Sequence, residues 1–150
     1  MTQNRRDVLK STGAMALLLS LGIVTTQQAM AAGRAGFDAK NLADAINALG
    51  GSPATSDQIT ITSPDIAENG AVVPVGVASR LPNTTEMFLL VEDNPLPLAA
   101  AFIIPAGTEP HVDTRLKMGQ STHVVAIVKA DGKLYSARKE TKVTLGGCGG

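Results

Sequence analysis

Short apolar stretches with a period of two restrict most strongly how this chain can fold. From residue 58 onward, apolar and polar residues alternate, and turn-forming residues recur about every ten residues. We expect seven strands, at residues 58–62, 71–79, 86–92, 98–104, 113–118, 122–129 and 133–145. Asp131 and Gly132 predict a tight hairpin turn. Strands of this length and spacing predict a mostly β fold, an immunoglobulin-like antiparallel β-sandwich.

One short helix is expected before the strands, over residues 37–51. Asp38 is the predicted N-cap, and Gly50 is the predicted stop. The apolar positions follow the i, i+3, i+4, i+7 spacing of one helix face: Leu42, Ala45, Ile46 and Leu49. This narrow face predicts a helix that packs as a lid on the sandwich.

Two runs place apolar residues on what we interpret as both faces of a strand. The runs contain Val72, Val73, Val75 and Val77, and residues 124–128. A sandwich strand with one solvated face should alternate, so something is expected to cover the second face. The cover is either the N-terminal helix or a central place in the sheet, or else a partner subunit.

The first 31 residues have the features of a signal peptide. A charged segment with Arg5 and Arg6 precedes an apolar stretch of about a dozen residues, and Ala31 ends a small-x-small cleavage site. The stretch is too short to span a membrane, which takes roughly 20 residues. The paired arginines resemble a twin-arginine export signal, although Asn4 and Val8 depart from its usual pattern. We therefore expect a periplasmic protein whose sandwich domain covers residues 32–145.

Composition argues against two classes of function. The chain has 13 basic and 13 acidic residues and only four aromatic residues, so it lacks the charge and stacking surfaces of nucleic-acid binding. It has one cysteine, and its two histidines, His111 and His123, have no neighbouring His or Cys in the sequence. A structural metal site is therefore disfavoured, and no cofactor is expected.

The last five residues, 146–150, carry the most specific chemistry. Cys148 is flanked by four glycines, Gly146, Gly147, Gly149 and Gly150. Glycines have no side chain to pack and a high backbone entropy, so we expect a mobile, slender arm that can insert a thiol into a pocket of another protein. No basic residue lies within four positions of Cys148 to lower its pKa. We therefore predict an attachment point that other proteins modify, and no catalytic residue in this chain.

This terminal segment and several internal segments resemble the SoxY family, the sulfur-carrying subunits of bacterial thiosulfate oxidation. The resemblance includes the arginine-containing leader and residues 66–75, 94–97, 114–116 and 143–150. It implies an immunoglobulin-like sandwich paired with SoxZ. It also implies that SoxAX loads thiosulfate oxidatively on Cys148 as a cysteine S-thiosulfonate. SoxB then releases sulfate, and a sulfane dehydrogenase oxidises the remaining sulfur.

Two other functions compete with this interpretation. Ubiquitin-like sulfur carriers also end in Gly-Gly, but they act in the cytosol, which contradicts the leader. A periplasmic binding or structural module could use Cys148 only for an intermolecular disulfide.

Several other features have structural interpretations. Arg138, Lys139 and Lys142 could attract anions, but a solvated strand edge is the favoured interpretation. The pairs at residues 92–93 and 69–70 are interpreted as turns.

Overall fold

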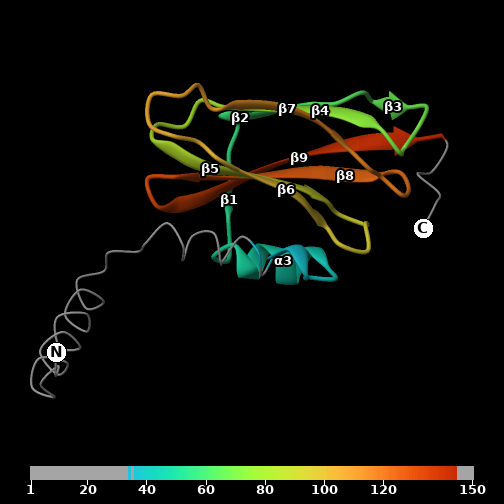
Figure 1. Ribbon diagram of the computed structural model, residues 1–150, viewed down its shortest axis with the longest axis horizontal. Helices are drawn as coiled ribbons and strands as arrows, with labels where there is room; N and C mark the ends of the chain where they lie inside the picture. Colours follow the sequence, from blue (N-terminus) through green and yellow to red (C-terminus); the bar gives the residue numbers. More distant parts are fainter. Residues whose placement is uncertain (1–33, 35, 145–150) are drawn as a thin grey trace, which may run out of the picture. The chain divides into compact units, whose positions relative to one another are not determined.

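The computed structural model describes residue 34 and residues 36–144, which form two packed β-sheets, a short helix and, before it, a few further helical residues at 34, 36 and 37 (Figure 1). The helix is α3, Leu42–Ala48. The strands are β1 (Ala54–Thr55), β2 (Ile59–Thr62), β3 (Ile66–Ala67), β4 (Val73–Ser79), β5 (Thr84–Val91), β6 (Leu98–Ile103), β7 (His111–Leu116), β8 (Thr122–Ala130) and β9 (Lys133–Val143). The predicted immunoglobulin-like sandwich with a short N-terminal helix is confirmed. The predicted signal peptide and terminal arm lie outside the described residues.

The strands form two open sheets. The large sheet has the order β1-β9-β8-β5-β6, with β3 added to β9, and the small sheet has the order β2-β4-β7. All neighbouring strands are antiparallel except β1 and β3, which each pair with β9 in parallel. All seven predicted strands are present, with small shifts at their ends. Sequence analysis missed β1 and β3, because two-residue strands are too short to show a period.

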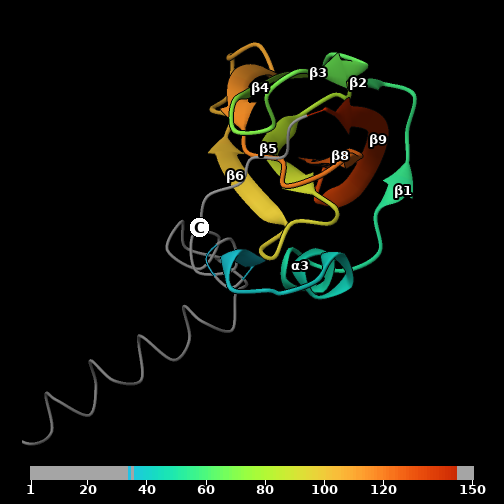
Figure 2. The same cartoon turned by 90° about the vertical axis from the view of Figure 1, so that its right-hand side faces the viewer.

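The two sheets pack face to face, and the core lies between them (Figure 2). Alternate residues of β4, β5 and β8 point inward, as the period of two requires. These buried residues are Val73, Val75, Val77, Met87, Leu89, Val91, Val124, Ala126 and Val128. The sequence pattern therefore placed the core correctly.

Helix α3 covers the outer face of the large sheet, as the prediction of a lid requires. Ala45 and Leu49 of the helix form a second cluster with Phe88, Leu90 and Val125 of the sheet. Ile127 and Leu98 complete the cluster. The outer, apolar face of β8 is therefore covered by helix α3 of the same chain. This is the first of the two alternatives that the sequence analysis considered, and a partner subunit was the second.

The interpretation of β4 as apolar on both faces is wrong. Val73, Val75 and Val77 are two residues apart, so all three lie on the same inner face and are buried. The outer face of β4 carries the small residues at positions 74, 76 and 78. Val72 precedes the strand and is 51% exposed. The outer face of β4 therefore carries only small side chains, and none of the three valines of the strand.

The helix begins later than predicted. Its N-cap is Asn41, whose side chain accepts a hydrogen bond from the amide of Asp44 at 2.8 Å. The predicted N-cap, Asp38, is wrong, because the capping oxygen must reach an amide two or three residues into the helix. The predicted stop is confirmed: Gly50 follows the C-cap Leu49 with a φ of 126°, a backbone conformation that glycine adopts without strain.

The predicted turns are present. Asp131 and Gly132 have positive φ values of 50° and 72° and connect β8 to β9, as a type I′ hairpin turn requires. Asn69 forms a side-chain-capped turn, because its Oδ1 accepts a hydrogen bond from the amide of Ala71 at 2.9 Å. Among the described residues, no helix has the length and hydropathy needed to cross a membrane.

Candidate functional site

The residues that the sequence singled out for sulfur attachment lie outside the described part of the chain. These are Cys148 and the arm glycines Gly146, Gly147, Gly149 and Gly150. The export-signal residues Arg5, Arg6 and Ala31 lie outside it as well. The described residues do include the point from which the terminal segment departs, at the end of β9. We call this point, residues 143 and 144 with their hydrogen-bond partners, the arm anchor.

Hydrogen bonds hold the arm anchor on two sides. The amide of Val143 donates to Ser121 Oγ at 2.8 Å. On the other side, the amide of Thr144 donates to the carbonyl oxygen of Ala67 at 3.0 Å, and Thr144 Oγ1 donates to that of Glu68 at 3.2 Å. Any segment that follows Thr144 therefore starts from a fixed position on the sandwich.

Strand β3 provides one of these two sides. It pairs in parallel with the end of β9, with Ile66 opposite Lys142 and Ala67 opposite Val143. Ala67 is buried in the core, which fixes the short strand in place. Figure 1 shows β3 beside the final part of β9. A two-residue strand at this position thus extends the ordered ladder to the last described residues.

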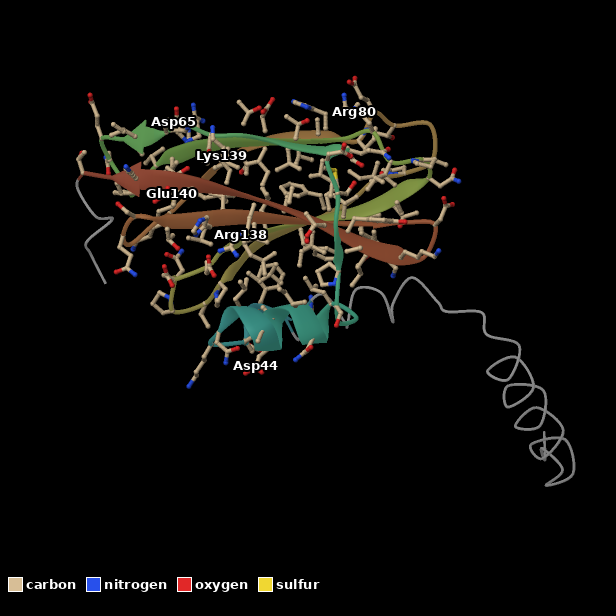
Figure 3. The ribbon with its side chains drawn as sticks, turned by 180° about the vertical axis from the view of Figure 1, so that it is seen from behind. Asp44, Asp65, Arg80, Arg138, Lys139 and Glu140 are labelled. Atoms are coloured by element: carbon tan, nitrogen blue, oxygen red, sulfur yellow. The ribbon has the colours of Figure 1, made fainter. Side chains whose placement is uncertain are left out.

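Two residues of β9 that precede the arm anchor also contact residues 63–65, which connect β2 to β3. Ser63 and Thr141 are both buried, and their hydroxyl oxygens lie 2.9 Å apart in a hydrogen bond. Lys139 Nζ donates to the carbonyl oxygen of Ser63 and forms an ion pair with Asp65 at 3.3 Å. Figure 3 shows Lys139 and Asp65 near each other at this end of the sandwich. Lys139 therefore ties β9 to the segment that leads into β3.

The outer face of β9 carries a second charged group of residues. Arg138 forms an ion pair with Glu92, and the same carboxylate lies 3.0 Å from His123 Nδ1. Glu92 follows β5 and is in the predicted turn, where Asp93 accepts a hydrogen bond from Thr122 Oγ1 at 2.6 Å. Residues 92 and 93 thus bind different partners, and the prediction of a turn is confirmed.

The three basic residues before the arm differ in their surroundings. Arg138 and Lys139 each contact a carboxylate, whereas Lys142 is exposed beside β3. Two of the three charges therefore already have acidic partners within the chain. This arrangement favours the interpretation of a charged, solvated strand over a cluster that attracts anions.

The two histidines do not form a site together. His111 is on β7 of the small sheet, where its Nε2 lies 2.8 Å from Asp113 Oδ2, and His123 is on β8 of the large sheet. The described residues contain no group of three or more His, Cys, Asp and Glu side chains that could hold a metal ion.

One groove in the described part of the chain lies on the outer face of the small sheet. It has a volume of about 620 Å³ and runs between β2 and β7 across β4. Its floor includes Pro74 and Gly76, and its walls include Thr62, Asp113 and Arg115. This groove is open and lined by both charge signs, and no sequence signal pointed to it.

A sequence profile of one family covers most of the chain. The profile of the SoxY family, described as sulfur oxidation protein SoxY, matches residues 46–148. The chain belongs to the SoxY family. The match extends through the arm anchor to Cys148. No curated protein matches the sequence.

One solved structure agrees with membership in the SoxY family. The structure of the sulfur carrier protein SoxY from Chlorobium limicola f thiosulfatophilum is 41% identical in sequence, with a TM-score of 0.64. The match covers 71% of this chain and 95% of that chain. A superoxide reductase (neelaredoxin) from Ignicoccus hospitalis is also similar, at 23% identity and a TM-score of 0.48, over 57% of this chain and 80% of that chain.

Sequence reasoning missed the residues that build the arm anchor. Ser121, Glu68 and Thr144 contribute single oxygen atoms to backbone hydrogen bonds, and no motif marks that role. Ser63 follows β2 and Thr141 lies within β9, and both are polar residues that are buried in a hydrogen bond to each other.

Proposed function

We propose that this SoxY-family protein carries sulfur covalently on Cys148 during periplasmic thiosulfate oxidation. The supporting observation is the family match, which ends on Cys148, the only cysteine of the chain. The related structure from Chlorobium is that of a sulfur carrier protein at 41% identity. The glycines on both sides of Cys148 add no side chain beside the sulfur, which suits a thiol that large partners must reach.

Loading of the carrier is a two-electron oxidation, and the release of sulfate is a hydrolysis. The Cys148 thiolate and the outer sulfur of thiosulfate form an S–S bond, and two electrons leave to the haem protein SoxAX. The product is a cysteine S-thiosulfonate. In a second step, water attacks the terminal sulfonate sulfur in SoxB, the bond between the two outer sulfur atoms breaks, and sulfate leaves with two protons. A persulfide anion remains on Cys148.

The arm anchor supports this role by its position. Cys148 lies four residues after Thr144, so an extended segment places its thiol up to about 13 Å from the anchor. A sulfur that stays attached to the protein has a high effective concentration at each enzyme that docks on the carrier. The fixed anchor limits the volume that the thiol explores, and this keeps that concentration high.

The leader and the family resemblance also suggest where this carrier acts and which proteins it meets. We propose export to the periplasm through the arginine-containing leader with Arg5 and Arg6, and cleavage after Ala31. The carrier is proposed to pair with SoxZ and to meet SoxAX, SoxB and a sulfane dehydrogenase transiently. In this proposal the chain itself is no enzyme, and it needs no cofactor, because the chemistry takes place in the visiting proteins.

Replacement of Cys148 tests the proposal most directly. Cys148→Ser is expected to abolish thiosulfate-dependent electron flow completely, since an alcohol cannot form the S–S bond. Intact-mass spectrometry should detect an added thiosulfate or sulfur atom on the parent protein from thiosulfate-grown cells. The same adduct should be absent from the Cys148→Ser variant.

The variant should leave the fold and the binding of SoxZ unchanged, which circular dichroism and co-purification check. Full electron flow in the purified Cys148→Ser variant would refute the carrier role. Sulfur found on the Gly150 carboxyl group would favour the ubiquitin-like alternative. An adduct-free Cys148 that forms only a disulfide to another chain would favour the binding-module alternative.

A further inference from the structure

Strand β9 continues beyond the last residue of its main partner strand, β8. The β8–β9 ladder ends where Thr122 lies opposite Thr141, whereas β9 runs on to Val143. The same register would place Gln120 opposite Val143, but the chain bends at residues 119–121 and the ladder does not reach them. On this side, the end of β9 therefore has no backbone partner from β8.

The hydroxyl group of Ser121 takes the place of the missing backbone partner. Ser121 Oγ accepts a hydrogen bond from the amide of Val143 at 2.8 Å. The same Oγ donates to the carbonyl oxygen of Val143 at 3.4 Å, which is a longer and weaker contact. One hydroxyl group thus binds both backbone groups that a continued β8 would bind, because it can donate and accept at once.

The opposite side of β9 is held at the neighbouring residues. The amides of Lys142 and Thr144 donate to carbonyl oxygens on the β3 side, at 2.9 and 3.0 Å. Backbone groups of successive strand residues point to opposite sides, so the amide and carbonyl of Val143 point away from β3. Ser121 is therefore the residue that holds Val143 on the side that β3 does not reach.

The contribution of Ser121 is confined to these two hydrogen bonds. The residue is exposed and lies outside both apolar clusters of the sandwich. Replacement by alanine removes a single oxygen atom from the surface and leaves no cavity in the core. The effect of the hydroxyl group can therefore be measured without a change in packing.

We propose that Ser121 is a positioning residue, which fixes the point where the segment that bears Cys148 leaves the sandwich. This inference rests on the function proposed above and identifies a residue outside the terminal segment that serves it. With Ser121 in place, β9 is held on both sides as far as Thr144, four residues before Cys148. Without it, two-sided pairing ends at Thr141, seven residues before Cys148.

The length of chain between the anchor and the thiol affects how often the thiol enters the active site of a docked enzyme. For a flexible tether, the effective concentration falls with roughly the −3/2 power of the length. An increase from four to seven residues therefore lowers it by at most about twofold. The chemical step keeps its rate, because it takes place in the visiting enzyme.

Hydrogen exchange tests whether Ser121 holds β9. In Ser121→Ala, the amide of Val143 should exchange about two- to tenfold faster than in the parent, the factor that corresponds to one lost hydrogen bond. Ser121→Thr keeps the hydroxyl group and should restore slow exchange. Ser56→Ala is the matched control, since Ser56 Oγ also accepts a backbone amide, that of Gln58 at 3.2 Å, but follows β1. It should leave the exchange of Val143 unchanged.

A competition measures the effect on sulfur loading. Equal amounts of the parent and of Ser121→Ala, each in complex with SoxZ, are mixed with thiosulfate and a limiting amount of SoxAX. The two chains differ in mass by one oxygen atom, so intact-mass spectrometry reads both adducts in one sample. The parent should carry more adduct, by up to about twofold. Ser121→Thr and Ser56→Ala should compete equally with the parent.

Two further measurements separate positioning from other effects. With each carrier alone, Ser121→Ala should raise the KM of SoxAX for the carrier and leave kcat unchanged. Iodoacetamide needs no docking, so it should alkylate Cys148 at the same rate in the parent and in Ser121→Ala. A lower kcat, or slower alkylation, would show that the substitution changes the thiol itself and would overturn the positioning role.

The outcomes distinguish this inference from the carrier role. Unchanged exchange of Val143 in Ser121→Ala would show that the hydroxyl group does not hold the strand. Faster exchange with equal adducts in the competition would show that the strand end does not position the thiol. Either result overturns the inference and leaves the carrier role standing. A parent chain that never carries an adduct on Cys148 would instead overturn the carrier role, and the positioning role with it.

Discussion

The outer faces of the two sheets differ in both composition and cover. The outer face of the large sheet is apolar at Phe88, Leu90, Val125 and Ile127, and helix α3 packs on it. Figure 2 shows the helix on this side of the sandwich and none on the other. The outer face of the small sheet carries small residues on β4 and exposed polar residues on β2 and β7, and the described chain leaves it open.

This difference shows that the elements packed on the outer face of a strand determine which side chains that face can carry. Val125 and Ile127 are buried because α3 covers them, and so β8 can be apolar on both faces. On the small sheet, Gly76 lies so close to its neighbour that a Cβ would be 2.5 Å from Asp113 Oδ1. The polar side chain of Asp113 therefore occupies the space that a larger β4 residue would fill.

Removal of apolar volume under the helix should have the largest effect on stability. Leu90 is fully buried between α3 and the large sheet. Leu90→Ala is expected to lower the free energy of unfolding by about 2–5 kcal/mol, because burial is lost and a cavity remains. Urea unfolding measures the change. The exposed Thr60 of the small sheet is the control: Thr60→Ala should change the free energy by less than about 0.5 kcal/mol. Equal losses in the two variants would contradict the difference between the faces.

Loss of the N-cap should have an intermediate effect, since it weakens the helix and leaves the apolar face intact. Asn41→Ala should lower the free energy of unfolding by about 1 kcal/mol, because the amide of Asp44 loses its capping oxygen. Asp38→Ala should change it by less than about 0.5 kcal/mol, as expected for a surface residue outside the cap. Far-UV circular dichroism during urea unfolding gives both values. A larger loss in Asp38→Ala than in Asn41→Ala would show that the helix begins at the earlier residue.

Added volume should have the smallest effect on the open face. Gly76→Ala is expected to lower the free energy of unfolding by less than about 1 kcal/mol, since the Asp113 side chain is 75% exposed and can turn away. Ala45→Val, under the helix, adds volume at a fully buried site and should cost about 1–3 kcal/mol. Thermal unfolding followed by calorimetry compares the two. A greater loss in Gly76→Ala would mean that the small sheet tolerates added volume less well than the covered sheet.

Much of the sandwich could be predicted because the responsible signals are local. The period of two assigned the strands, and the Asp131-Gly132 pair placed the last hairpin. The interpretation of β4 as apolar on both faces was wrong because residues two apart in a strand lie on the same face. Val73, Val75 and Val77 are two residues apart, so all three side chains lie on one face. Val72 has the opposite parity, but it precedes the strand and is exposed, so it does not make the second face apolar.

The arm anchor could not be predicted, because its contacts join distant parts of the chain. Val143 meets Ser121, and Thr144 meets Ala67 and Glu68, more than seventy residues earlier in the second case. Each contact uses a single hydroxyl or backbone group that many other residues could supply. Only the packing of β3 against β9 selects these partners.

By itself, the sequence determined the alternation that buries one face of each strand, the turns between them and the resemblance carried by the residues around Cys148. Local backbone geometry and composition are sufficient for these, since they depend on neighbouring residues. The tertiary structure decided which apolar face α3 covers and how β9 is held at Thr144. These features depend on which strands become neighbours, and that follows from the packing of the whole chain in three dimensions.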